Sequence, residues 1–392
     1  MRKTAAVIGA GPAGLMAAEV LSAGGVAVTV YDRMPSVGRK FLMAGRGGLN
    51  LTHSESFEIF LARYGAALAH LRPMLEAFPP SALIDWANTL GADTFTGSSG
   101  RIFPKAMKAS PLLRAWLDRL DRQNVQFRLR HDWRGWLDSA LRFQTPDGDT
   151  AKNHDIAILA LGGASWPRLG GDGGWTVLLQ DKGVEIAPLR PANMGVNANW
   201  SEIFRTRFAG QPLKKIMLSF GGHIARGDAV ITRYGIEGGA VYALSSVLRE
   251  AAAGGKPIIL DIDLRPDLSQ HQIAGRLARP QGKESRTNYL RKALGLSPIE
   301  TNLLRETNTL PDHLKAIALA ITDHQPITRA ISTAGGISFN ALDGTLMLKA
   351  IPGTYAIGEM LDWEAPTGGY LLQACFSTAV FAARAALNKM AA

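Results

Sequence analysis

The stretch TAAVIGAGPAGLMAAEVLSAGGVAVTVYD, residues 4 to 32, decides the fold of this chain. It reads as a β-strand, a tight turn, a helix that stops at Gly24-Gly25, and a second strand that ends at Asp32. Its glycines satisfy the pattern G-x-G-x-x-G between the first strand and the helix, and the acid follows about twenty residues later. The sequence therefore predicts a dinucleotide-binding βαβ unit in a Rossmann-like α/β domain.

Each residue of this fingerprint has a physical task. Gly9 makes the turn, Gly11 lets the backbone approach a pyrophosphate, and Gly14 lets the helix pack closely on the strand. The helix N-terminus stabilises the phosphates, and Asp32 is expected to accept a hydrogen bond from the adenosine ribose. The residues assigned to the cofactor in this stretch are Gly9, Gly11, Pro12, Ala13, Gly14 and Asp32.

The composition limits the classes of protein that this chain can be. Its 392 residues are enough for two domains. No segment reaches the ~18 uninterrupted apolar residues of a membrane span, and the start, MRKTAAVIGA, lacks the apolar core of a signal peptide. The single cysteine, Cys375, excludes an intrachain disulfide and a cysteine-rich metal site, and no metal-ligand spacing is present. We therefore expect a cytoplasmic protein with no metal and no membrane partner.

The formal net charge of +10 is concentrated in two stretches. Residues 101–134 contain nine Lys and Arg against three Asp, and residues 276–292 contain six against one Glu. Such stretches are typical of surfaces that bind polyanions, but also of an ordinary solvated face in a basic protein. The sequence leaves both interpretations open.

The strand and helix patterns divide the chain into three segments. Residues 1–188 and 327–392 carry the signals of one α/β domain. Residues 189–326 differ, because antiparallel strand patterns such as KKIMLSFGGHIARGDAVIT precede a helical region with proline breaks. We expect residues 189–326 to form an inserted β-barrel-like and helical domain.

Two further strand ends favour a flavin dinucleotide over a nicotinamide. A buried strand ends at Gly162 and Gly163, which put bare backbone beside a bound dinucleotide. A C-terminal strand ends at Gly358 and Glu359, and Glu359 can accept a hydrogen bond from a ribityl hydroxyl. The sequence predicts FAD rather than FMN, bound non-covalently, because only FAD has the adenosine diphosphate half that the fingerprint serves.

The turn after this strand opens a long apolar helix. Backbone N–H groups around Gly368, Gly369 and Tyr370 can point at the N1–C2=O edge of a flavin. Reduced flavin carries negative charge at that edge, and a helix N-terminus stabilises it.

The stretch GRKFLMAGRGGLNLTH, residues 38 to 53, is a second glycine-rich segment. It is too glycine-rich for a good helix and too irregular for a strand. Its cations Arg39, Lys40 and Arg46 indicate an anionic ligand. We expect this segment to wrap around the cofactor.

The sequence resembles the aminoacetone-oxidase-like, YhiN/BaiN-type flavoproteins. The matching pieces are GAGPAGLMAA, GRKFLMAGRGGLNLTH, GRIFPKAMKAS, LALGGASWPRLGGDGG, TAGGISF and GEMLDWEAPTGGYLLQACFSTAVFAA. The resemblance implies an FAD-binding domain of the two-dinucleotide-fold type, interrupted by a β-barrel-like and helical insertion. It also implies that Arg39 and Lys40 lie near the pyrophosphate, and that residues 44–50, with Ala44, Gly45, Arg46 and Asn50, lie near the isoalloxazine.

The resemblance has one departure and leaves the catalytic residue open. Many relatives have G-G-G-R-C-N where this chain has G-R-G-G-L-N at 45–50, so no role of that cysteine transfers. Lys105 and Lys108, in the matching GRIFPKAMKAS, could face the flavin or an anionic substrate, or lie on a solvated basic surface. The catalytic candidates are Lys105, Lys108 and Tyr370.

Three functions are compatible with these motifs. The first is an FAD-dependent oxidoreductase that moves hydride to or from a small molecule, at a C–N bond or an activated C=C bond. The second, which the basic stretches favour, is reduction of uracil to dihydrouridine in ribosomal RNA. The third is a flavin sensor or assembly factor without turnover. Because a second nucleotide fingerprint is absent, NAD(P)H is expected only as a transient electron donor.

Overall fold

The computed structural model describes residues 2–45, 47–255 and 258–391. The chain forms two compact units, Met1–Arg190 together with Ser332–Ala392, and Pro191–Ile331. These limits lie a few residues beyond the boundaries expected from the sequence, 188/189 and 326/327. We call them the first and the second unit.

The first unit is built on a five-stranded parallel sheet, with strand order β19-β10-β1-β2-β6. Its strands β1 and β10 are buried almost throughout, as expected for a parallel sheet with both faces covered. The strands are β1 (Thr4–Ile8), β2 (Ala27–Asp32), β6 (Gln126–Leu129), β10 (Ile156–Leu159) and β19 (Thr354–Ala356). The predicted Rossmann-type fold is confirmed.

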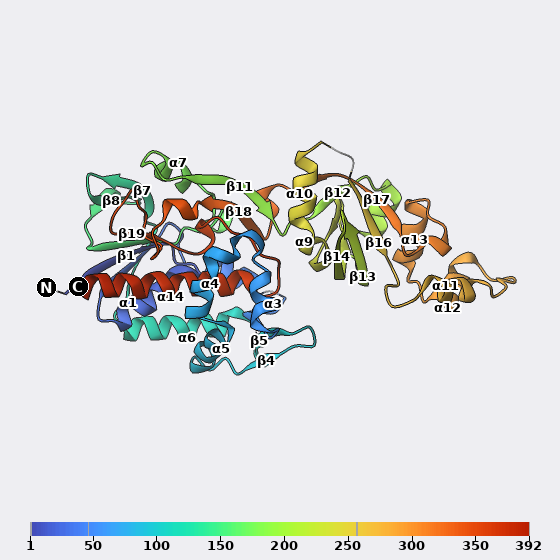
Figure 1. The fold of residues 1–392 in the computed structure, drawn as a ribbon, viewed down its shortest axis with the longest axis horizontal. Coiled ribbons are helices and arrows are strands. Elements are labelled where there is room, and N and C mark those ends of the chain that lie inside the picture. Colours follow the sequence, from blue (N-terminus) through green and yellow to red (C-terminus); the bar gives the residue numbers. More distant parts are fainter. Residues whose placement is uncertain (1, 46, 256–257, 392) are drawn as a thin grey trace. The chain divides into compact units, whose positions relative to one another are not determined.

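Two apolar helices pack against each other beside this sheet, α1 (Pro12–Ala23) and α14 (Tyr370–Ala391) (Figure 1). Among the described residues, α14 is the one helix long and apolar enough to cross a membrane. However, 61% of its apolar window is buried inside the protein, where α14 packs on α1 and α4 (Leu68–Ala77). It is therefore a core helix of the first unit.

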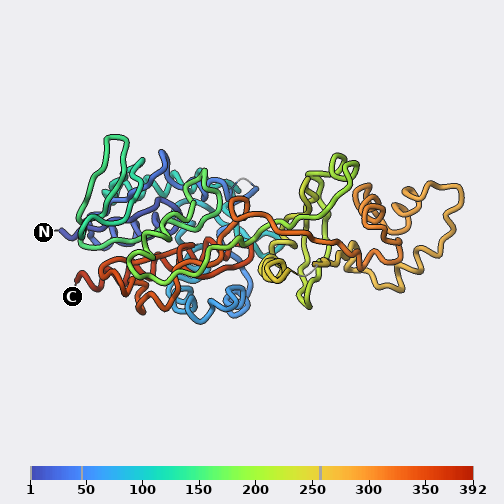
Figure 2. Tube along the Cα trace, turned by 90° about the horizontal axis from the view of Figure 1, so that it is seen from above, coloured from blue at the N-terminus to red at the C-terminus, as the bar shows by residue number. Residues whose placement is uncertain are grey.

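The rest of the first unit consists of short elements around the sheet. Strands β3, β5 and β4 form one small sheet, and the antiparallel strands β7, β8 and β9 form another. The bounds are β3 (Thr52–His53), α3 (Phe57–Ala62), α5 (Pro80–Thr89), β4 (Thr94–Thr96), β5 (Arg101–Pro104), α6 (Ala109–Arg122), β7 (Asp132–Leu137), β8 (Ala140–Thr145), β9 (Gly148–Lys152), α7 (Trp175–Gln180), β11 (Ile186–Ala192) and β18 (Ser332–Ile337). The chain leaves this unit along β11 and returns along β18, and these two strands run side by side as a pair (Figure 2).

The segment 38–53 contains a helix that the sequence did not predict, α2 (Arg39–Ala44). Its glycines flank the helix instead of interrupting it. Gly38 precedes the first turn in the left-handed region (φ 66°), and Gly45 follows the last. The intervening residues are good helix formers, and Phe41 is buried in the core. The expectation of an irregular loop was therefore wrong for these six residues.

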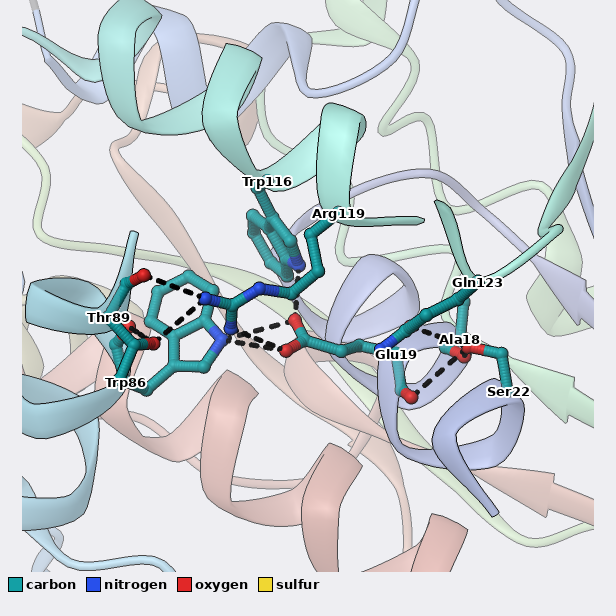
Figure 3. A network of polar contacts seen from close by, with 8 residues as sticks. All are labelled: Ala18, Glu19, Ser22, Trp86, Thr89, Trp116, Arg119 and Gln123. Atoms are coloured by element: carbon teal, nitrogen blue, oxygen red, sulfur yellow. Dashed lines mark hydrogen bonds and ion pairs between the residues drawn. The ribbon is translucent and has the colours of Figure 1, made fainter. Parts of the chain in front are cut away.

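A partly buried carboxylate connects three helices of the first unit (Figure 3). Glu19 of α1 accepts hydrogen bonds from the indole of Trp116 at 2.6 Å and from the indole of Trp86 at 3.1 Å. Arg119 of α6 forms an ion pair with the same carboxylate at 2.9 Å and also donates to Thr89 of α5. Glu19 therefore fixes the position of α1, whose N-terminus carries the glycine fingerprint.

The second unit is a closed six-stranded barrel, with strand order β12-β15-β14-β13-β16-β17, and its described residues also form six α-helices. Its strands are β12 (Val196–Ala198), β13 (Pro212–Phe220), β14 (His223–Ile231), β15 (Gly235–Glu237), β16 (Ile258–Asp263) and β17 (Ile317–His324). Its helices are α8 (Glu202–Phe208), α9 (Gly239–Ala243), α10 (Ser245–Ala253), α11 (Gln270–Leu277), α12 (Arg286–Leu294) and α13 (Pro298–Glu306). The predicted combination of a β-barrel with helices is confirmed.

Candidate functional site

The three fingerprint glycines differ in what surrounds them. A Cβ on Gly9, which has φ +108°, would lie 2.3 Å from the carbonyl oxygen of Ala160, and a Cβ on Gly14 would lie 1.9 Å from the carbonyl oxygen of Gly9. Both glycines are required by the packing of the protein itself. Gly11 has an ordinary φ of −80°, and a Cβ on it would meet no protein atom within 4 Å. The open space at Gly11 lies at the N-terminus of α1, where a bound phosphate group is stabilised.

Asp32 lies beside this turn, at the end of β2. Its carboxylate accepts hydrogen bonds from the backbone N–H of Ala10 and of Met34, both at 2.7 Å. Burial raises the pKa of Asp32, and these two N–H groups oppose the rise. Each carboxylate oxygen keeps a second acceptor position, so Asp32 can also accept from a ribose hydroxyl.

Lys40 and Glu359 are joined by an ion pair of 2.8 Å. Lys40 also donates to the hydroxyl of Ser165 at 2.9 Å, and the backbone N–H of Thr333 donates to Glu359 at 2.9 Å. The backbone N–H of Gly163 approaches the same carboxylate at 3.3 Å. The pair therefore connects α2, the loop after β10, β18 and the segment after β19, which are far apart in sequence. Sequence reasoning missed Ser165 and Thr333, because neither residue type is distinctive without its contacts.

The glycines at the ends of β10 and β19 allow close packing around this pair. A Cβ on Gly163 would lie 2.2 Å from the hydroxyl of Thr333, and a Cβ on Gly358 would lie 2.9 Å from the Cβ of Ala13. Gly162 has φ +72°, and its carbonyl accepts a hydrogen bond from the indole of Trp175. The structure thus brings Gly162 and Gly163 close to Glu359, and Gly358 close to the first turn of α1.

Helix α2 and the segment after it contain buried polar atoms that no described residue satisfies. They are Nε of Arg39, Oδ1 of Asn50 and Oγ1 of Thr52. Buried polar groups are normally hydrogen-bonded, so these atoms are consistent with a polar ligand along 39–52. Gly45 is close-packed against Ala109 of α6. Ala44 ends α2, and Arg46 lies outside the described residues.

Tyr370 belongs to a cluster at the N-terminus of α14. Its hydroxyl donates to Glu55 at 2.6 Å, its ring stacks on His53, and Arg63 forms an ion pair with Glu55. Burial and the neighbouring Glu55 raise the pKa of Tyr370 well above its ordinary value. Tyr370 is therefore a poor proton donor as long as it holds Glu55. Sequence reasoning missed Glu55 and Arg63, which the α3 region supplies.

The two glycines that precede Tyr370 lie close to β3. A Cβ on Gly369 would lie 2.5 Å from the backbone of Thr52, and Gly368 has φ +139°. Only residues without a side chain fit there, so the N-terminus of α14 lies directly against β3.

Lys105 and Lys108 are both exposed, on the turn between β5 and α6. This turn is held against the segment 45–50, because the N–H of Leu49 donates to the carbonyl of Met107 at 2.8 Å. A Cβ on Gly48 would lie 2.7 Å from Cε of Met107. The two lysines therefore lie on a turn that contacts the expected isoalloxazine segment, with their side chains accessible to an anionic ligand.

These features fit FAD. The open cradle at Gly11, the anchored Asp32 and the unsatisfied polar atoms of 39–52 provide places for a pyrophosphate, a ribose and further polar groups. Among the described residues, no group of three or more His, Cys, Asp or Glu side chains could hold a metal ion.

Comparison with known proteins identifies the family of this chain. The sequence profile described as "HI0933-like protein Rossmann domain" matches residues 3–385. A 3-dehydro-bile acid delta(4,6)-reductase of Clostridium scindens is 26% identical, with 98% of each chain covered. A ribosomal RNA dihydrouridine synthase of Escherichia coli is 24% identical, with 96% of each chain covered.

Solved structures show the same fold at low sequence identity. A flavocytochrome c3 fumarate reductase in an open conformation has a TM-score of 0.54 at 15% identity, covering 98% of this chain and 78% of the other. The 3-ketosteroid-delta4-(5alpha)-dehydrogenase of Rhodococcus jostii has a TM-score of 0.50 at 14% identity, covering 98% and 97%. Because the profile spans nearly all of the sequence, this chain belongs to the HI0933-like family and is an FAD-dependent oxidoreductase.

Proposed function

We propose that this protein uses non-covalently bound FAD to reduce a carbon–carbon double bond conjugated with a carbonyl group in a small molecule. One observation carries the choice of bond. Two relatives align with this chain over nearly their full lengths. One is named a 3-dehydro-bile acid delta(4,6)-reductase, and the other is named a ribosomal RNA dihydrouridine synthase. A 4,5-double bond beside a 3-ketone and the C5=C6 bond of uracil are both polarised by a conjugated carbonyl, so one chemistry serves both substrates.

The chain's own residues have distinct tasks in this proposal. FAD, when bound, supplies the hydride transfer. The N-terminus of α1 and Gly11 hold the pyrophosphate, and Asp32 holds the adenosine ribose. The backbone N–H groups at Gly368 and Gly369 stabilise negative charge on the cofactor.

Lys105 and Lys108 are the proposed contacts to the substrate. Conjugate reduction places negative charge on the carbonyl oxygen of the substrate before a proton reaches the neighbouring carbon. An exposed ammonium on the turn that contacts Gly48 can stabilise that charge or supply the proton. Tyr370 is less suited to this role, because its hydroxyl donates to Glu55.

Anaerobic reoxidation of the reduced protein tests the proposal. The flavin is reduced with NADPH or NADH, a 3-keto-4-ene steroid or uridine is then added, and the flavin absorbance is followed. Aminoacetone is added in a separate experiment to the protein with oxidised flavin. The proposal expects rapid reoxidation by at least one conjugated C=C substrate and formation of its saturated product. Reduction of the oxidised flavin by aminoacetone, with no reaction of either conjugated substrate, would instead identify an amine oxidase.

A second candidate is the same reduction of uracil within ribosomal RNA. It is favoured by the net charge of +10 and by the exposed cations at 276–292. Formation of dihydrouridine in an rRNA transcript, with no reaction of free uridine or of the steroid, would select this candidate.

A further inference from the structure

Helices α11 and α12 form a strongly basic surface of the second unit. All six cations of residues 276–292 are exposed: Arg276, Arg279, Lys283, Arg286, Arg291 and Lys292. The same stretch contains a single acid, Glu284. We call these six side chains the α11–α12 basic surface.

The cations of this surface lie near one another in space. Glu284 forms an ion pair with Lys292. The pKa of Glu284 is lowered by the hydrogen bond from Lys292, and also by the charges of Arg279 and Arg291. Three cations therefore surround one carboxylate, and the positive charge that remains is not compensated by any other ion pair among the described residues.

A further cation reaches the same helices from α13. The guanidinium of Arg305 donates to the hydroxyl of Thr287, in the first turn of α12, at 3.2 Å. The N-terminus of α12 adds the positive end of its helix dipole. This end of the second unit therefore offers several cations to a ligand that carries repeated negative charges.

The apolar side chains of the two helices point inward. Ile273, Leu290 and Leu294 are at most 2% exposed, and the hydroxyl of Tyr289 donates to the carbonyl of Leu277, which ties α12 to α11. The surface therefore presents charge without the apolar side chains that insert a helix into a lipid headgroup layer. A cationic surface of this kind is suited to a phosphodiester backbone.

The first basic stretch, 101–134, is different. Arg119 forms an ion pair with the partly buried Glu19, and Arg134 pairs with Asp132. The remaining cations are spread over β5, α6, β6 and the segments between them. This stretch does not provide a comparable cluster.

We propose that the α11–α12 basic surface binds the phosphate backbone of RNA and so brings a structured RNA to this enzyme. The proposal rests on the second candidate function, reduction of uracil in RNA. Recognition is by charge, so base sequence is not read at this surface.

Salt-dependent binding of the full-length holoprotein to a fluorescent RNA hairpin tests this. If about five phosphates are contacted, the slope of log K against log salt is about −3.5 to −4.5. The variant Arg279→Gln/Arg286→Gln/Arg291→Gln removes three contacts and flattens the slope by about 2 to 3 units. The matched control Arg207→Gln/Lys214→Gln/Lys215→Gln makes the same change of charge on α8 and β13 of the same unit, and keeps the slope of the parent.

Flavin absorbance and thermal unfolding show that each variant is folded and loaded, and both are expected to stay unchanged. Equal slopes in the two triple variants, or no salt-dependent RNA binding by the parent, would overturn the proposal. Tighter binding to phosphatidylglycerol vesicles than to RNA would do the same. Reduction of free conjugated substrates is measured in parallel. RNA binding then tests the role of the α11–α12 basic surface, and the reduction assay tests the proposed function separately.

Discussion

The ammonium of Lys40 and the carboxylate of Glu359 lie 2.8 Å apart, although 319 residues separate them in the sequence. Glu359 is also held by the N–H of Thr333, and Lys40 by the hydroxyl of Ser165. The pair therefore attaches the segment after β19 to α2, near the N-terminus of the chain. It also means that each of the two charges already has a partner before any cofactor contact is considered.

Removing the charge of Lys40 is expected to weaken cofactor binding. Lys40→Met leaves Glu359 without its cation, and the segments that the pair connects lose their common anchor. We expect the affinity of the apoprotein for FAD to fall about tenfold or more, as for the loss of a charge-assisted hydrogen bond. Flavin fluorescence titration measures this. Lys349→Met, at an exposed lysine of the same unit, serves as the control, and an unchanged affinity in Lys40→Met would show that the pair has no such role.

Gly11→Val is expected to abolish FAD binding without unfolding the apoprotein. A Cβ on residue 11 meets no protein atom within 4 Å, and we expect the valine side chain to fill the space proposed for the pyrophosphate. Gly14→Val is the contrasting variant, since its Cβ would clash with the carbonyl of Gly9, and it should destabilise the apoprotein itself. Thermal unfolding and flavin absorbance together separate the two effects. Full flavin loading of Gly11→Val would contradict the assignment.

The flavin is expected to leave the protein on acid precipitation. The contacts proposed for it are hydrogen bonds and the N-terminus of α1, which are non-covalent, so FAD should appear in the supernatant and migrate as FAD in chromatography. A yellow pellet would indicate a covalent bond, and recovery of FMN would contradict the fingerprint assignment.

Glu19→Gln is expected to destabilise the first unit. The amide loses the ion pair with Arg119 and presents only one oxygen to the two indoles, so the free energy of unfolding should fall by about 2–4 kcal/mol. Chemical denaturation measures the loss. Glu58→Gln, which breaks an exposed pair with Arg72, is the matched control and should have little effect. Equal stability of the two variants would show that the network of Figure 3 contributes little.

Glu300 is expected to make the second unit sensitive to acid. Burial raises its pKa, but the hydrogen bonds from Arg265 and Ser297 outweigh this, and the pKa lies below its ordinary value of 4.5. A lowered pKa stabilises the fold above the pKa of the unfolded chain, and this stabilisation is lost as the pH falls through the folded value. Glu300→Gln should therefore be less stable than the parent at neutral pH, and the difference should shrink below pH 4.5. Denaturation curves between pH 3 and 7 test this, and a constant difference would exclude the linkage.

The sequence predicted the elements whose signals are local. The βαβ unit at 4–32 contains strand, glycines and acid in one continuous stretch, and the structure has each of them where the sequence predicts it. The helix Arg39–Ala44 was missed because the prediction relied on the glycine content of residues 38–48. Two of these glycines, Gly38 and Gly45, flank the helix and do not interrupt it. The cluster of His53, Glu55, Arg63 and Tyr370 was also missed, because three of its members come from one end of the chain and Tyr370 from the other.

The sequence by itself determined the Rossmann-type domain, the insertion and the class of cofactor. These depend on spacings within short segments, where backbone geometry follows from residue type. Only the tertiary structure decided that Gly11 faces open space while Gly9 and Gly14 are packed, and that Lys40 pairs with Glu359. It also decided that Arg119 is committed to Glu19 while the cations of α11 and α12 remain exposed. The partner of a side chain depends on which distant segments pack against it. Local sequence patterns do not show these segments, so the partner becomes known only from the packed structure.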